Sequence, residues 1–267
     1  MASGAATHVY HRVLGHLLQS VGAARSEVQP FSHTYFENLF PADIYGRMLD
    51  SLPEPARHNA AADRHYGDAK TGSVRWMYAL SKDGLEQLPA TTRDLWRGIA
   101  AALSDPEVKR AVFAKLAADL AFRYGTSELD VPELAGHSRP TLYREVDGFE
   151  IPPHPDTRKK IVTMHLYFPA DLSQIGLGTA LYKRRLLALP FGNWQRRFEK
   201  VKQFDFRPNS GYAFVVNNTL TKRSWHGRER LPEGAGVRNT LLNTFYAEQR
   251  EGYCGYLADD VPVKRAA

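Results

Sequence analysis

Two kinds of hydrophobic spacing divide the chain into a first half that predicts helices and a second half that predicts strands. Apolar residues recur every three or four positions over about 8–24, 44–49, 95–103 and 107–120. That spacing is typical of amphipathic helices that bury one face. Pro41 and Pro53 flank the second of these helices, and the run Ser104-Asp105-Pro106 closes the third.

The second half contains short runs rich in β-branched and aromatic residues, separated by glycine and proline. The clearest predicted strands are Thr141–Val146, Lys160–Phe168, Gly211–Val216 and Val237–Tyr246, after an earlier short strand at Val74–Leu80. Helices followed by strands favour an α+β fold, with an antiparallel sandwich or barrel and helices packed outside it. We expect one domain over 1–267, with 1–120 as a mainly helical support and 121–255 as the β core.

Residues 182–204 interrupt the β region with a basic insert. Trp194, Phe198 and Val201 have helical spacing there, beside seven lysines and arginines. Such an insert is either a lid that recognises a carboxylate or phosphate group, or a solvated helix with a basic outer face. The loop at 57–75 is a second candidate lid, with the same two interpretations.

Composition narrows the class of protein and of ligand. Of 267 residues, 43% are hydrophobic and 24% charged, as in an ordinary globular protein. A net charge of +6 and a pI of about 9.3 favour an acidic ligand, either a carboxylate or phosphate metabolite or nucleic acid. The single Cys254 excludes an internal disulfide and fits a reducing cytosol. Because no run of eighteen apolar residues exists, we expect no membrane span and a cytoplasmic protein.

The pair His154 and Asp156 is the first candidate for chemistry. On extended backbone, residues i and i+2 point to the same side, so both side chains can reach one ion. The neighbouring prolines Pro152, Pro153 and Pro155 favour an extended segment at a strand end or in a loop. Two histidines and one carboxylate can hold one face of an octahedral iron(II).

The third ligand must come from a small choice, since only His165 and His226 lie downstream of Asp156. His165 falls in the middle of a predicted strand, with Thr163 and Tyr167 on the same face. A mid-strand histidine is more often a core or ligand-contacting residue, so His226 is the preferred third ligand.

An anchor for an organic acid follows His226. After the turn at 234–236, Arg238 and Thr240 share one face of a predicted strand, so guanidinium and hydroxyl can meet one carboxylate. Arg228 and Arg230 are rivals, but we expect both to lie in a solvated polar loop.

These residues together resemble the 2-oxoglutarate/iron(II)-dependent oxygenase superfamily, and its prolyl-hydroxylase-like branch in particular. The resemblance covers about 140–247, which includes the segment Gly148–Asp156, the strand Lys160–Pro169, Gly176–Thr179, the turn Arg207–Gly211, His226 and Arg238–Thr240. It implies a double-stranded β-helix core (jelly-roll, cupin-like), with the N-terminal helices packed outside.

The resemblance also implies roles for individual residues. His154, Asp156 and His226 would ligate Fe(II), and Arg238 would bind the 5-carboxylate of 2-oxoglutarate. Thr240 matches the serine or threonine of the R-x-S pattern, while Thr163 and Tyr167 match inward positions beside the co-substrate. His165 stands where the superfamily commonly has an apolar residue, and it is a candidate donor to a carboxylate of co-substrate or substrate.

The implied activity is oxidation of a substrate by O2, with decarboxylation of 2-oxoglutarate to succinate. The carboxylate of Asp156 favours hydroxylation over halogenation, because related halogenases have glycine or alanine at that position. Our first hypothesis is a hydroxylase of a small metabolite that bears a carboxylate or phosphate.

Three alternatives stay open. The pI prompts an oxidative demethylase of nucleic acid, but those enzymes usually carry a second arginine where this chain has Thr244, so nucleic acid is disfavoured as a partner. A barrel that binds without catalysis is opposed by the complete ligand set. A metal-dependent hydrolase is disfavoured because no general-base carboxylate is identifiable near the ligands.

Overall fold

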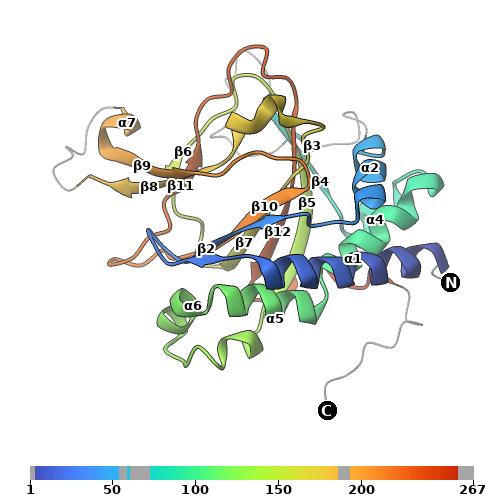
Figure 1. Ribbon diagram of the computed structural model, residues 1–267, viewed down its shortest axis with the longest axis horizontal. Helices are drawn as coiled ribbons and strands as arrows, with labels where there is room; N and C mark the ends of the chain where they lie inside the picture. Colours follow the sequence, from blue (N-terminus) through green and yellow to red (C-terminus); the bar gives the residue numbers. More distant parts are fainter. Residues whose placement is uncertain (1–3, 54–58, 61–72, 186–192, 258–267) are drawn as a thin grey trace.

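The computed structural model describes residues 4–53, 59–60, 73–185 and 193–257. Antiparallel strands form two sheets, a larger one and a smaller one that lies at its left in Figure 1. The large sheet has the order β1 (Ser26–Glu27), β2 (His33–Glu37), β10 (Ser210–Val215), β7 (Lys160–Tyr167), β12 (Arg238–Tyr246), β5 (His137–Glu145), β4 (Arg75–Ala79) and β3 (Asn59–Ala60). The small sheet has the order β6 (Ile151–His154), β11 (His226–Arg228), β8 (Ala180–Arg184) and β9 (Phe198–Gln203).

The path of the chain between the two sheets identifies the architecture. From β5 to β12 the chain passes from large sheet to small and back, with only β8 and β9 consecutive in one sheet. Four core strands therefore lie in each sheet, in the order β10-β7-β12-β5 and β6-β11-β8-β9. This is the double-stranded β-helix, or jelly roll. The predicted fold class is confirmed.

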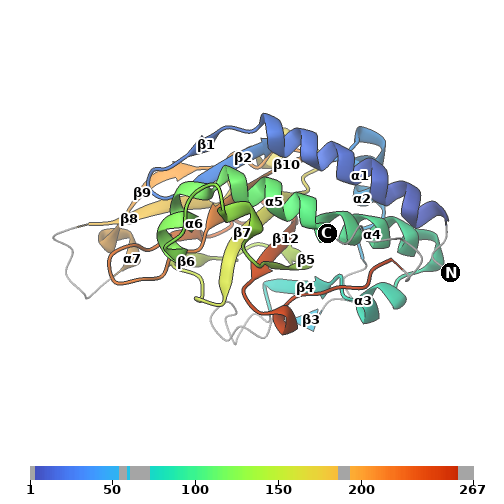
Figure 2. The same ribbon diagram turned by 90° about the horizontal axis from the view of Figure 1, so that it is seen from below.

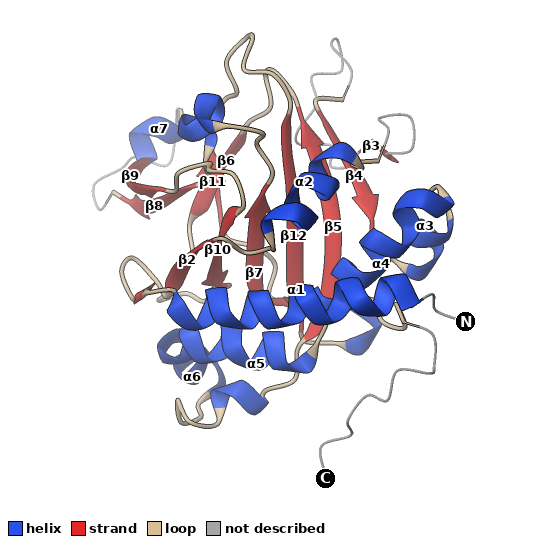
Figure 3. Cartoon of the chain, turned by 45° about the vertical axis from the view of Figure 1, so that its right-hand side comes forward, coloured by secondary structure: helices blue, strands red, loops and turns tan. Residues whose placement is uncertain are grey.

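Helices cover the outer face of the large sheet. Figure 3 shows α1 across this sheet with α5 and α6 beside it, and Figure 2 shows the same layer from below. The helices are α1 (Gly4–Ala23), α2 (Ala42–Asp50), α3 (Lys82–Glu86), α4 (Ala90–Leu103), α5 (Pro106–Lys115), α6 (Ala117–Tyr124) and α7 (Trp194–Arg197), with short 3-10 turns at Val131–Glu133, Leu172–Leu177 and Gln249–Glu251. In the part of the chain that the structure describes, no helix is long and apolar enough to cross a membrane.

Side chains on β7 alternate between the apolar core on one face of the large sheet and the space between the two sheets on the other. Met164 and Leu166 belong to the apolar cluster that includes α1, α2, α4 and α5. Thr163, His165 and Tyr167 take the intervening positions, so they point to the other face, toward the small sheet. Because both faces are covered, β7 is buried almost throughout. The space between the sheets is therefore where polar side chains of the large sheet can meet a ligand.

Two predicted helices differ in the structure. The helix expected over 107–120 is two helices, α5 and α6, which meet at Leu116. The helix indicated by the spacing in the basic insert is wrong for most of its length. The helix α7 ends at Arg197, and Phe198–Gln203 forms β9, which pairs with β8. Pairing with β8 satisfies the backbone of this segment, and Val201 is left 41% exposed. Most of the loop at 57–75, and residues 186–192 of the insert, lie outside the described residues.

Close packing of α1 on α4 gives a stability prediction. A Cβ on Gly98 of α4 would lie 2.6 Å from the carbonyl oxygen of Ala6 and 2.7 Å from Cβ of Val9, both in α1. We expect Gly98→Ala to push the helices apart and to lower the free energy of unfolding by about 1–3 kcal/mol, measured by urea denaturation. Gly15→Ala is the control, because its Cβ meets open space and should stabilise α1 by up to about 1 kcal/mol. A Gly98→Ala protein as stable as the parent would contradict the packing.

Candidate metal centre

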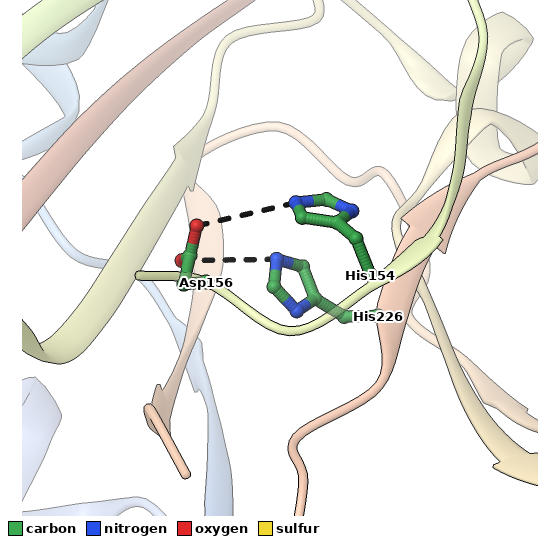
Figure 4. Close-up of side chains that lie close together, drawn as sticks. All are labelled: His154, Asp156 and His226. Carbon is green, nitrogen blue, oxygen red and sulfur yellow. Dashed lines mark ion pairs between the residues drawn. The ribbon is translucent and has the colours of Figure 1, made fainter. Parts of the chain in front are cut away.

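His154, Asp156 and His226 converge at one end of the space between the sheets. His154 ends β6, Asp156 follows it by two residues, and His226 begins β11, which pairs with β6 so that the two histidines lie opposite each other. The Nε2 atoms of His154 and His226 lie 4.0 and 3.8 Å from the carboxylate oxygens of Asp156. Figure 4 shows both rings turned toward that carboxylate. One ligand atom from each residue lies within 4.8 Å of the others.

Backbone carbonyls select the tautomer of both histidines. Nδ1 of His154 lies 3.1 Å from the carbonyl oxygen of Pro152, and Nδ1 of His226 lies 2.9 Å from that of Ser224. A carbonyl oxygen only accepts, so each Nδ1 donates its hydrogen there and each Nε2 keeps a lone pair. Both lone pairs are therefore available to an ion beside Asp156, with orientation fixed by the second hydrogen bond.

The protonation states suit a cation. Burial, together with the charge of His154, lowers the pKa of His226 to about 3. Burial also lowers the pKa of His154. Burial alone would raise the pKa of Asp156, but the charge of Lys160, followed by those of His226 and His154 where these are protonated, outweighs burial and holds that pKa well below its ordinary value. At neutral pH the site thus consists of two neutral imidazoles and one carboxylate, which is a donor set for a divalent transition metal.

Two neighbours hold the carboxylate of Asp156 in place. Lys160 Nζ donates to Oδ1 at 2.7 Å, and Thr163 Oγ1 donates to Oδ2 at 2.9 Å. Both donors come from β7, which begins four residues after Asp156. The chemistry and orientation of these residues fit Fe(II), with three protein ligands on one side. Sequence reasoning missed Lys160, although its position four residues after a ligand carboxylate was visible.

A cavity of about 280 Å³ opens beside the three candidate ligands. Of the predicted co-substrate residues, Arg238, Thr163 and His165 line it. Tyr167 and Thr240 are buried but are not among the lining residues. The phenol oxygen of Tyr167 accepts a hydrogen bond from the backbone N–H of Thr179 at 3.1 Å. These two predicted residues therefore stand behind the cavity wall.

Arg238 is held from several sides. Its side chain is 1% exposed, its Nε donates to the carbonyl oxygen of Leu177 at 2.9 Å, and its Nη1 donates to Glu145. Its guanidinium carbon lies 4.7 Å from the ring centroid of Phe206 and 5.5 Å from that of Tyr167. These contacts fix the plane of the guanidinium and leave little freedom to the side chain.

Glu145 is a buried neighbour of Arg238 that sequence reasoning missed. In the register of the large sheet, Glu145 on β5 stands between Arg75 on β4 and Arg238 on β12. Its carboxylate pairs with Arg238 on one side and with Arg75 Nε at 3.1 Å on the other. An inward glutamate in the predicted strand Thr141–Val146 was the available signal.

Arg228 corrects the sequence prediction. It was expected in a solvated loop, but it ends β11, is 5% exposed and lines the cavity. The physical reason is that it follows His226 by two residues on a strand, so both side chains turn inward. Arg230, the other rival, is exposed as expected.

His165 also lines the cavity as a neutral side chain. Burial, followed by the charges of Arg238 and Arg75, lowers its pKa well below the ordinary value. Its Nδ1 lies 3.2 Å from the hydroxyl of Tyr212. Its Nε2 is buried and has no hydrogen-bond partner among the described residues. This ring can therefore offer one polar atom to a ligand.

Comparison with known proteins gives matches only among solved structures. No family model and no curated protein matches the chain. A prolyl-4-hydroxylase from Pseudomonas putida matches with a TM-score of 0.48 and 12% identity over 88% of this chain and 99% of the other. The carbocyclase SnoK of nogalamycin biosynthesis, described as non-heme and α-ketoglutarate-dependent, matches with a TM-score of 0.48 and 8% identity, over 86% of this chain and 82% of SnoK. HygX from Streptomyces hygroscopicus, solved with nickel and 2-oxoglutarate, matches with a TM-score of 0.40 and 11% identity, over 80% of this chain and 82% of HygX.

The buried histidines predict a pH dependence of folding. Because the folded pKa of His226 is depressed from 6.5 to about 3, its neutral form contributes stability that is complete above about pH 6.5 and is lost progressively below it. The loss from this group is at most about 1.4 kcal/mol for each pH unit. Urea denaturation of metal-free protein at pH 7.5, 6, 5 and 4.5 measures it. In His226→Gln the fall should be shallower, and an identical slope in both proteins would refute the attribution.

Proposed function

We propose that the chain is an Fe(II)- and 2-oxoglutarate-dependent dioxygenase that hydroxylates a small anionic metabolite. The observation that carries this proposal is the trio His154, Asp156 and His226, with both Nε2 lone pairs facing one ionised carboxylate beside a cavity. A double-stranded β-helix with a buried arginine on β12 supplies the surroundings that the proposal needs.

Each side chain then has a stated task. His154, Asp156 and His226 hold Fe(II), which when bound supplies the activation of O2. Lys160 and Thr163 keep the carboxylate of Asp156 oriented. Arg238 receives the distal carboxylate of 2-oxoglutarate through the N–H groups that Glu145 and the Leu177 carbonyl leave open. In the overall reaction, one oxygen atom enters the substrate as hydroxyl and the other enters succinate, while the 1-carboxyl carbon leaves as CO2.

The charge of the cavity supports an anionic substrate. Four cationic side chains line it, Arg75, Lys160, Arg228 and Arg238, against the carboxylates of Glu145 and Asp156. A bound divalent metal adds two positive charges, and dianionic 2-oxoglutarate removes two. The excess positive charge left over favours a substrate with a carboxylate or phosphate group. We place the enzyme in the cytosol, since its one cysteine, Cys254, is free.

Uncoupled turnover tests the proposal without knowledge of the substrate. We expect purified protein with Fe(II), 2-oxoglutarate and O2 to form succinate slowly, with none formed when Fe(II) is left out. The chain with Asp156→Ala serves as the paired protein without a complete ligand set. Succinate at equal rates in both proteins would contradict the assignment.

A further inference from the structure

Arg228 is a buried cation that forms no ion pair with any residue that the structure describes. Its side chain lies on β11 at 5% exposure, and no described residue forms an ion pair or hydrogen bond with it. Its Nε is fully buried. An arginine removed from water without a partner costs free energy, so such a residue is retained where an anion from outside completes its hydrogen bonds.

Arg238 faces the same cavity with only part of its guanidinium available. Glu145 occupies Nη1 and the Leu177 carbonyl occupies Nε, whereas Nη2 is buried and has no partner among the described residues. Two of the five N–H donors of Arg238 are therefore taken, and Glu145 also holds part of its positive charge. A second cation beside the same carboxylate would strengthen the anchor predicted from sequence.

The two arginines come from opposite walls. Arg228 belongs to the small sheet and Arg238 to the large sheet, and both line the cavity beside the candidate metal ligands. Resting on the proposed function, we propose that Arg228 and Arg238 together bind the distal carboxylate of 2-oxoglutarate, each donating to it from its own sheet. Arg228 thus adds a second charged donor to an arginine that already shares its charge with Glu145.

The electrostatics agree with this geometry. Both residues are arginines, whose guanidinium groups stay protonated in proteins, and both line the cavity. A carboxylate placed between them replaces repulsion with two charge-assisted interactions. Glu145 cannot serve both, because its oxygens already pair with Arg75 and Arg238.

We call the pair Arg228 and Arg238 the clamp. Binding of two acids that differ only at the distal end tests whether the clamp binds the distal carboxylate. We expect Arg228→Met to weaken binding of 2-oxoglutarate to the Fe(II) protein under anaerobic conditions by about 10- to 100-fold, the range for a lost hydrogen bond between charged groups. Binding of 2-oxopentanoate, which has a methyl group in place of that carboxylate, should not change. Arg238→Met should show the same selectivity with Fe(II) still bound, and Arg230→Met, an exposed arginine two residues along, should bind both acids like the parent.

The outcomes separate the clamp from the proposed function. A parent protein that binds Fe(II) but not 2-oxoglutarate would overturn the proposed function itself. A parent that binds 2-oxoglutarate, with equal affinity in Arg228→Met, would overturn the clamp alone. Equal losses for both acids would also overturn it, because Arg228 would then act elsewhere than at the distal carboxylate. Unchanged Fe(II) affinity in each variant shows that the site is still folded.

Discussion

Replacing His154 with alanine is expected to weaken Fe(II) binding by more than about 100-fold while the protein remains folded. Outer partners of metal ligands alone are worth 10- to 100-fold in affinity, so loss of a ligand should exceed that range. The side chain of His154 is 33% exposed, so its removal opens no sealed cavity in the core. Anaerobic equilibrium titration with Fe(II) gives the affinity, and thermal unfolding of the metal-free protein reports the fold.

His8→Ala is the matched control, because His8 is exposed on α1, among the helices on the outer face of the large sheet. It should bind Fe(II) like the parent. Affinity of the His154→Ala protein within a few-fold of the parent would remove His154 from the ligand set and leave the H-x-D pair without a role.

Replacing Glu145 with alanine is expected to be the most destabilising single change at the site. Arg75 is 8% exposed and Arg238 only 1%, and both lose the carboxylate that pairs with them. Removing one partner of a buried ion pair costs about 3–5 kcal/mol, here chiefly because the buried charge of Arg238 loses its carboxylate. The free energy of unfolding, from urea denaturation, measures the effect.

Glu133→Ala provides the comparison for Glu145→Ala. Glu133 pairs with Arg110 at 3.1 Å, but its side chain is 67% exposed. A surface pair of this kind contributes about 0–1 kcal/mol. If both variants lost the same small amount, the Arg75–Glu145–Arg238 row would be no more than a surface-like pairing.

The sequence predicts the sheets and helices where one periodicity dominates. Strands β7, β10 and β12 begin and end within one or two residues of the expected bounds, since their alternation has no competitor. In the basic insert, three apolar residues at helical spacing predict a helix, but pairing with β8 makes most of that segment a strand. Tertiary pairing of this kind is invisible to local spacing.

The candidate site likewise contains residues that the sequence predicts and residues that only the structure reveals. His154, Asp156 and His226 can be found because ligand chemistry restricts both residue type and spacing, and the structure brings them together. Glu145 and Arg228 could not be ranked, because their importance lies in burial and in what stands beside them. Glu145 becomes notable only when the register places it between two arginines, and Arg228 only when β11 turns it inward.

The most direct test of the account is anaerobic addition of Fe(II) and then 2-oxoglutarate, followed by visible absorption. We predict a weak charge-transfer band that appears only when both are present, is absent in His154→Ala with Asp156→Ala, and saturates at one Fe(II) for each chain. A parent protein that gives no band, or a band unchanged in the double variant, would contradict the assignment of this site as an Fe(II)/2-oxoglutarate centre.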